Sequence, residues 1–147
     1  MSMLSPKIQN LTRQLLDLEA AQDKACEADV EVVVRVIEEL RARLIRLAGV
    51  EGFRSLLARA LTLAKVESPL LNGVHISASG SLEGFEGTEE NPDAQQSGIR
   101  LVGHLLELLV TFIGAPLTLH LVRDAWPEAS MPEASMDKVD FRAEDTP

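Results

Sequence analysis

His104 and Glu107 are the pair whose residue types and spacing could do chemistry. They stand three positions apart in residues 101–127, the most apolar stretch of the chain. Side chains three positions apart on an α-helix share a face, and a carboxylate that orients an imidazole is a common arrangement in functional sites. Histidine can act as a base, a metal ligand or a phosphate acceptor. We therefore take His104 and Glu107 as the candidate functional pair.

Two specific chemistries at His104 form the alternative to a structural role. Histidine phosphotransfer domains are helical bundles with a reactive histidine on one helix, and His104 is similar only in that placement. The lysine and glycine that usually follow such a histidine are missing, because the local sequence is HLLE. A di-iron bundle needs several Glu and His ligands on four helices, whereas Glu38 and Glu39 lie on the charged side of their helix and no second His pair exists. A structural histidine is the simpler interpretation.

Other reactive residue types give no recognisable site. Cys26 is the only cysteine, so the chain has neither an internal disulfide nor a multi-cysteine metal site, and its acidic neighbours disfavour the thiolate. Five acidic residues crowd positions 83–93 without the spacing of an EF-hand loop. The signatures of serine, cysteine and carboxylate hydrolases are absent. We therefore expect a protein that is not an enzyme and needs no cofactor or metal.

The charge distribution narrows the class of partner. Residues 1–67 hold ten basic and ten acidic side chains, whereas residues 68–147 hold four basic and thirteen acidic ones. This acidity disfavours binding to nucleic acid and to anionic membrane surfaces, and it would attract a protein partner that accepts an acidic surface. The N-terminus lacks the pattern of a secretory signal, which favours a cytoplasmic location.

Three helices are predicted in the first half of the chain. The first follows Ser5 and Pro6, a favourable start for a helix, and frays towards Cys26. The second, residues 29–49, has an apolar a/d seam that could pack within the chain, which we favour, or across a homodimer. The third, residues 52–68, turns back after a short link and ends before Pro69. The predicted apolar positions are Ile8, Leu11, Leu15 and Leu18; Val33, Ile37, Leu40, Leu44 and Leu47; and Phe53, Leu57, Ala60 and Ala64.

A change of pattern predicts a hairpin followed by a fourth helix. Residues 74–83 alternate apolar and polar side chains, with a turn near Ser79 and Gly80. Asn91 and Pro92 then suit a helix start. Along this helix Arg100, His104, Glu107 and Thr111 form one narrow polar stripe. Three ionisable residues in such a helix argue against a membrane span and for the centre of a soluble bundle.

The end of the chain divides into a short structured segment and a tail. Residues 116–126 suit either a strand or a short helix, and Pro116 and Pro127 favour the helix. Trp126 is interpreted as an anchor to the bundle and is also a candidate interaction residue. Residues 127–136 repeat PEASM, and the acidic segment beyond them lacks the means to form a core. Its apolar island, Val139 and Phe141, is a candidate docking motif.

The sequence thus predicts an all-α bundle of about four main helices with a short C-terminal helix. Residues 1–126 form the domain, with a small β-hairpin and acidic loop inserted at about 72–92, and residues 127–147 form a flexible acidic tail. We expect a regulatory or adaptor protein that acts by protein–protein interaction. The alternative is a phosphotransfer-like or metal-binding bundle centred on His104. A small apolar ligand in the Leu-rich core is a third possibility.

Overall fold

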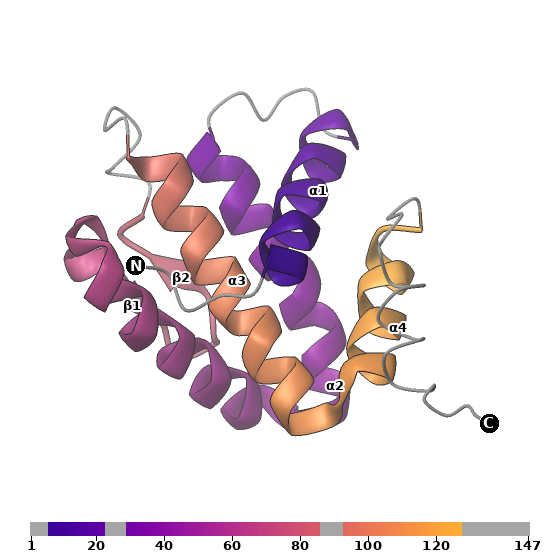
Figure 1. The fold of residues 1–147 in the computed structure, drawn as a ribbon. Helices are drawn as coiled ribbons and strands as arrows, with labels where there is room; N and C mark the ends of the chain where they lie inside the picture. The colour runs from indigo at the N-terminus through magenta and orange to yellow at the C-terminus, as the bar shows by residue number, and fades with distance from the viewer. Residues whose placement is uncertain (1–5, 23–28, 86–92, 128–147) are drawn as a thin grey trace.

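The protein is a helical bundle with one small hairpin, shown in Figure 1. The computed structural model describes residues 6–22, 29–85 and 93–127. The elements in chain order are α1 (Pro6–Gln22), α2 (Asp29–Glu67), the 3₁₀ helix η1 (Pro69–Gly73), β1 (His75–Ile76), β2 (Leu82–Glu83), α3 (Ala94–Ile113) and α4 (Ala115–Ala125). The predicted all-α bundle with a β-hairpin insertion is confirmed.

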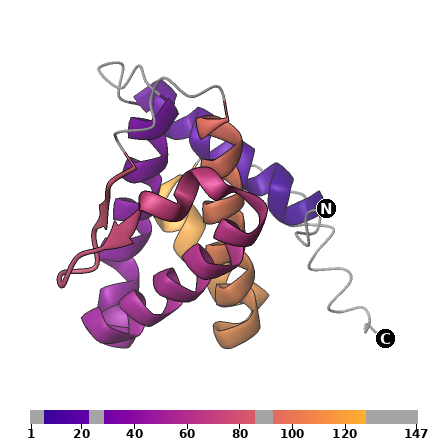
Figure 2. The same ribbon diagram turned by 90° about the vertical axis from the view of Figure 1, so that its left-hand side faces the viewer.

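Gly49 divides α2 into two arms, residues 29–48 and 50–67. Its backbone has φ 78° and ψ 170°, a combination that only glycine adopts without strain. The second arm therefore turns back beside the first at this residue, as Figures 1 and 2 both show. The sequence predicted a break here but allowed a longer link, through residues 50–52. The turn is made by one glycine, and helix resumes at once.

The helix α3 forms the centre of the core and packs mainly against α2. Eleven of its twenty residues are buried, and the predicted apolar positions of both α2 arms are buried against the same core, except Leu47. From Val33 to Leu44 the seam of the first arm is thus packed within one chain, as favoured from the sequence. Gly98 permits the close approach, because a Cβ added there would lie 2.4 Å from Cγ2 of Val33.

The hairpin is held against α2. Its two strands are antiparallel, with His75 opposite Glu83 and Ile76 opposite Leu82, and Gly80 takes φ +90° in the turn. From α2, Arg41 Nε donates a hydrogen bond of 2.9 Å to the Ser79 carbonyl oxygen, and Arg54 Nε donates one of 3.2 Å to that of Ser77. Figure 2 shows the hairpin at the edge of the bundle beside α2. A two-stranded hairpin this short needs such support to persist.

The helix α4 settles the ambiguity of residues 116–126, because 116–125 are helical rather than extended. Gly114, at φ 91° and ψ 154°, separates α4 from α3, and Pro116 lies in the first turn of α4, where its missing N–H costs nothing. The chain therefore turns sharply at the end of α3 and α4 runs back along the bundle (Figure 1). Val139 and Phe141 lie outside the described residues, as do Cys26, Asn91 and Pro92.

Candidate functional site

The candidate histidine lies in a buried polar cluster where α2 ends against α3. His104 is 4% exposed, and its Nε2 lies 3.5 Å from Oε1 of Glu67. Nε of Arg100 lies 3.7 Å from the same carboxylate oxygen. These separations are ion-pair rather than hydrogen-bond distances. Two groups from α3 therefore face one carboxylate from the last residue of α2.

Arg100 also closes the end of α2. Its Nη1 donates a 2.9 Å hydrogen bond to Oγ of Ser68 and a 3.2 Å hydrogen bond to the carbonyl oxygen of Glu67. The last carbonyls of a helix have no partner inside the helix, so a guanidinium here satisfies an acceptor and suits the negative end of the helix dipole. The cluster of Glu67, Arg100 and His104 thus joins α2 to α3.

The sequence-predicted partner of His104 is not the residue that the structure brings to it. Glu107 lies on the same helix and is half-buried, and in the described part of the chain its carboxylate makes no ion pair with His104. Glu67, which is 37 positions away in the sequence, takes that place. No periodicity within one helix could have found Glu67, because the contact depends on where the second arm of α2 ends relative to α3.

A polar pocket opens beside this cluster. Its volume is about 190 Å³, and its lining includes Glu67, Ser68, Asp93, Ser97 and Arg100. The lining holds two carboxyl-bearing residues, Glu67 and Asp93, and one guanidinium, that of Arg100, so its formal charge is −1. His104 lies deeper, outside the lining.

The cluster is poorly arranged for metal binding. In residues 6–22, 29–85 and 93–127, no group of three or more His, Cys, Asp or Glu side chains could hold a metal ion. Glu67 and His104 offer two ligands, but the third neighbour is a guanidinium whose permanent positive charge repels a cation.

The cluster is equally poorly arranged for phosphoryl transfer at Nε2. That atom is shielded from solvent, so a phosphoryl donor could reach it only after the helices separated. A phosphate on Nε2 would also stand against the Glu67 carboxylate and repel it.

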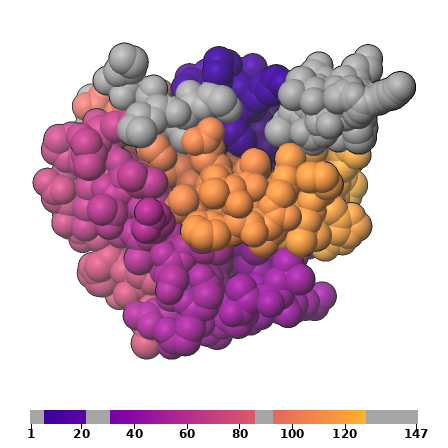
Figure 3. Space-filling model, turned by 60° about the horizontal axis from the view of Figure 1, so that its bottom comes forward, coloured from indigo at the N-terminus to yellow at the C-terminus, as the bar shows by residue number. Residues whose placement is uncertain are grey.

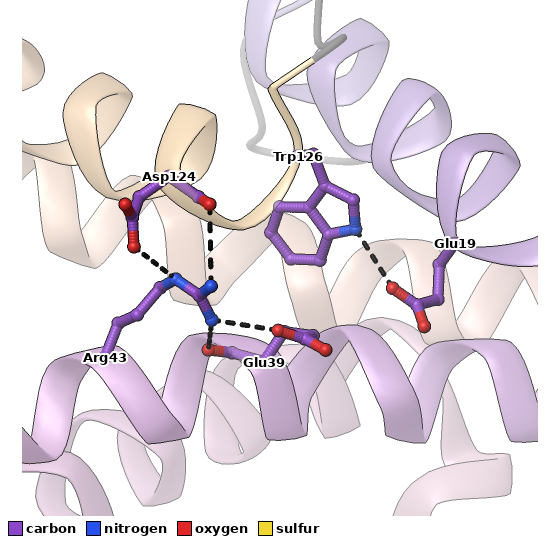
Figure 4. Close-up of polar contacts among 5 residues, drawn as sticks. All are labelled: Glu19, Glu39, Arg43, Asp124 and Trp126. Carbon is purple, nitrogen blue, oxygen red and sulfur yellow. Dashed lines mark hydrogen bonds and ion pairs between the residues drawn. The ribbon is translucent and has the colours of Figure 1, made fainter. Parts of the chain in front are cut away.

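A second polar arrangement fixes α4 to the bundle, as Figure 4 shows. Nε1 of Trp126 donates a 3.0 Å hydrogen bond to Oε1 of Glu19 on α1, and both side chains are buried. On the outside, Arg43 Nε lies 2.9 Å from Oδ2 of Asp124, and Arg43 Nη1 lies 2.8 Å from Oε1 of Glu39. The predicted anchoring role of Trp126 agrees with this geometry. The indole is 0% exposed, so a partner could not reach it in this conformation.

Large apolar side chains are exposed at the two corners of the bundle. Leu47 and Val50 flank the Gly49 corner of α2, whereas Phe112 and Leu117 flank the corner between α3 and α4. Both corners lie at the same end of the molecule (Figures 1 and 2), and Figure 3 views that end. Leu47 is 54% exposed and Phe112 is 62% exposed. We call these four residues the apolar end.

One helix has the length and apolar character of a membrane span. Residues 94–113 reach a mean hydropathy of 1.2 over the most apolar window, and 56% of that window is buried inside the protein. The core helix of a soluble bundle passes the same test, so this is weak evidence for a membrane span.

No protein-family model matches the chain, and no match exists among the curated proteins or the solved structures.

Proposed function

We propose that this chain is a non-enzymatic regulatory or adaptor protein that binds another protein through its apolar end. The observation that carries the proposal is the exposure of Leu47, Val50, Phe112 and Leu117 at two corners that lie at the same end of the bundle. Single exposed apolar residues are ordinary on a protein surface, but several gathered in one region are typical of an interaction site. Val66 is the other exposed large apolar residue among those described, and it lies away from these corners, at the end of the second arm of α2.

Contact energetics favour this surface over the rest of the molecule. Covering apolar surface contributes about 25 cal/mol per Å², and aromatic residues are enriched at the centres of interfaces. Phe112 is the only exposed aromatic side chain in the described part of the chain, since Phe53, Phe85 and Trp126 are buried. The acidic second half would add long-range attraction for a partner that accepts an acidic surface.

The alternative centred on His104 has less support. The ring is buried, its neighbours are Glu67 and Arg100, and no third metal ligand lies beside it in the described residues. These contacts suit a structural role that joins α2 to α3.

The proposal is tested with variants of the apolar end in the full chain. Leu47→Ser and Phe112→Ser should each leave the fold intact, because surface substitutions change stability by about 0.5 kcal/mol or less. Together they should weaken binding to a partner captured from the source cells by at least about tenfold, which corresponds to about 1.4 kcal/mol. Val66→Ser is the matched control, because its side chain is 82% exposed but lies outside the apolar end.

Three outcomes of this experiment are informative. A protein that binds the wild type and Val66→Ser, but not the double variant, supports the proposal. A protein that binds all three equally shows that the apolar end is not its contact surface. If the captured protein is a second copy of this chain, sedimentation of the purified wild type and the double variant would show whether the apolar end is the dimer interface.

A further inference from the structure

We propose that the acidic tail of this chain, residues 128–147, binds the apolar end of the same molecule through Val139 and Phe141. The protein would then cover its own contact surface until a partner displaces the tail. The inference rests on the proposed function, because both take the apolar end as the contact surface. The tail lies outside the described residues.

Charge complementarity is the first support. Residues 41–59, which form the Gly49 corner and its flanks, contain five arginines and one acidic residue, whereas the tail contains six acidic and two basic residues. Arg41, Arg43 and Arg54 are engaged by carboxylates of the bundle. Arg46 and Arg59 are exposed and have no ion pair with another described residue. Arg46 is directly beside Leu47 in the sequence, so an acidic segment over the apolar end would meet an unpaired positive charge.

The apolar content of the tail is the second support. Val139 and Phe141 are separated by Asp140, and an extended segment places positions i and i+2 on the same side. Bound in that form, the segment would direct two apolar side chains to the apolar end while Asp140 remained in water. The neighbouring Asp137 supplies further negative charge for Arg46.

The length of the tail is the third support. Pro127, the last described residue, follows α4, and α4 begins at the corner that carries Phe112 and Leu117. Eleven residues of α4 span about 16 Å. The eleven residues between Pro127 and Val139 can extend to about 36 Å. Val139 can therefore reach back past the whole of α4 to the apolar end.

Tethering makes even a weak contact effective. A segment on a short linker is present at an effective concentration of about 1 mM. With an intrinsic Kd of about 100 µM, the tail would occupy the apolar end in about nine molecules of ten. The same arithmetic predicts that a competing ligand binds about tenfold more weakly to the wild type than to a variant whose tail cannot dock.

The test compares the full-length wild type with Phe141→Ser by ¹⁵N NMR. Loss of the tail contact should move backbone amide signals at residues 46–51 and 111–118, which are far from position 141 in the sequence. Met131→Ser is the matched control, because it removes an apolar side chain from the same tail but outside the island. Arg46→Glu should move the signals of residues 111–118, which are far from position 46 in the sequence, as Phe141→Ser does. A synthetic peptide of residues 128–147 should bind full-length Phe141→Ser about tenfold more tightly than the wild type.

The outcomes separate this inference from the proposed function. Signal changes at both corners that do not depend on protein concentration support docking of the tail within one molecule. Changes that grow with concentration show that a second copy supplies the tail, and changes confined to the neighbours of position 141 show that it does not dock, so either result overturns the inference. Because the NMR test needs no partner, tail docking can be established even if the apolar end proves to bind no other protein.

Discussion

Gly98→Ala is predicted to destabilise the protein although alanine is the better helix former. Gly98 is buried near the start of α3, where a Cβ would lie 2.4 Å from Cγ2 of Val33 and 3.3 Å from its Cβ. Carbon atoms in ordinary contact are about 3.5–4.0 Å apart, so the two groups must separate by about 1 Å. Val33 is β-branched and nearly fixed at χ1 in a helix. The helices α2 and α3 must therefore move apart.

Two opposing terms set the size of the effect. Replacing glycine by alanine within a helix contributes about 1 kcal/mol of stability. Overpacking a close interface costs about 1–3 kcal/mol, and the upper half of that range applies because neither partner can rotate away. The net expectation is a loss of about 1–2 kcal/mol in the free energy of unfolding. At this chain length, that lowers Tm by about 3–6 °C.

Urea unfolding followed by tryptophan fluorescence measures this change directly. Trp126 is the only tryptophan and is fully buried. Gly73→Ala is the control, because a Cβ at Gly73 would meet nothing within 4 Å. Combining Gly98→Ala with Val33→Ala removes the clashing methyl groups, so the double variant should be at least about 1 kcal/mol more stable than additivity predicts. A Gly98→Ala protein as stable as the wild type would refute the close packing of α2 on α3.

Four further substitutions test the remaining structural assignments by circular dichroism during thermal unfolding. Gly49→Ala should lower the free energy of unfolding by about 1–3 kcal/mol through backbone strain alone, because nothing lies within 4 Å of the added Cβ. An unchanged stability would contradict the φ of 78° at this residue. Trp126→Phe should lower the free energy of unfolding by about 1–3 kcal/mol, because it leaves the buried carboxylate of Glu19 without its indole donor. A loss below about 0.5 kcal/mol would show that this hydrogen bond contributes little to stability. His104→Ala should lower the free energy of unfolding by about 2–4 kcal/mol, because it leaves a cavity at a buried position. Glu107→Ala should change it by about 0.5 kcal/mol or less. Equal effects of the two substitutions would favour the pairing of His104 with Glu107 that the sequence predicted.

Regular periodicity made most of the fold predictable. The repeats that predicted the helices report which face of each element is apolar, and burial of that face determines how the element packs. Proline and glycine marked the corners because their backbone limits are local properties. The hairpin followed from alternation and a turn sequence for the same reason. What local patterns could not supply was the arrangement of one element against another.

His104 illustrates that limit. The sequence predicted that His104 lies on a helix. It did not predict the partner of His104, because Glu67 belongs to another helix. Spacing within one helix identifies neighbours on that helix only. Arg100 was recognisable as part of a polar stripe, yet its hydrogen bond to the last carbonyl of α2 depends on the end of α2 meeting α3. Contacts between elements that are distant in the sequence require the tertiary structure.

Leu47 shows how the same limit bears on function. The a/d pattern placed it in the core with Leu40 and Leu44, and those two residues are fully buried, whereas Leu47 is half exposed. The reason is that Gly49 turns the chain two residues after Leu47. Leu47 is therefore the end of the seam, and no helix covers it. The uncovered end of the seam is a surface against which another apolar segment can bury its side chains. Little conformational entropy of the bundle is lost on such binding, because the helix is already ordered. Tail, second copy and partner protein would compete for this position, and Leu47→Ser should weaken whichever of them binds there.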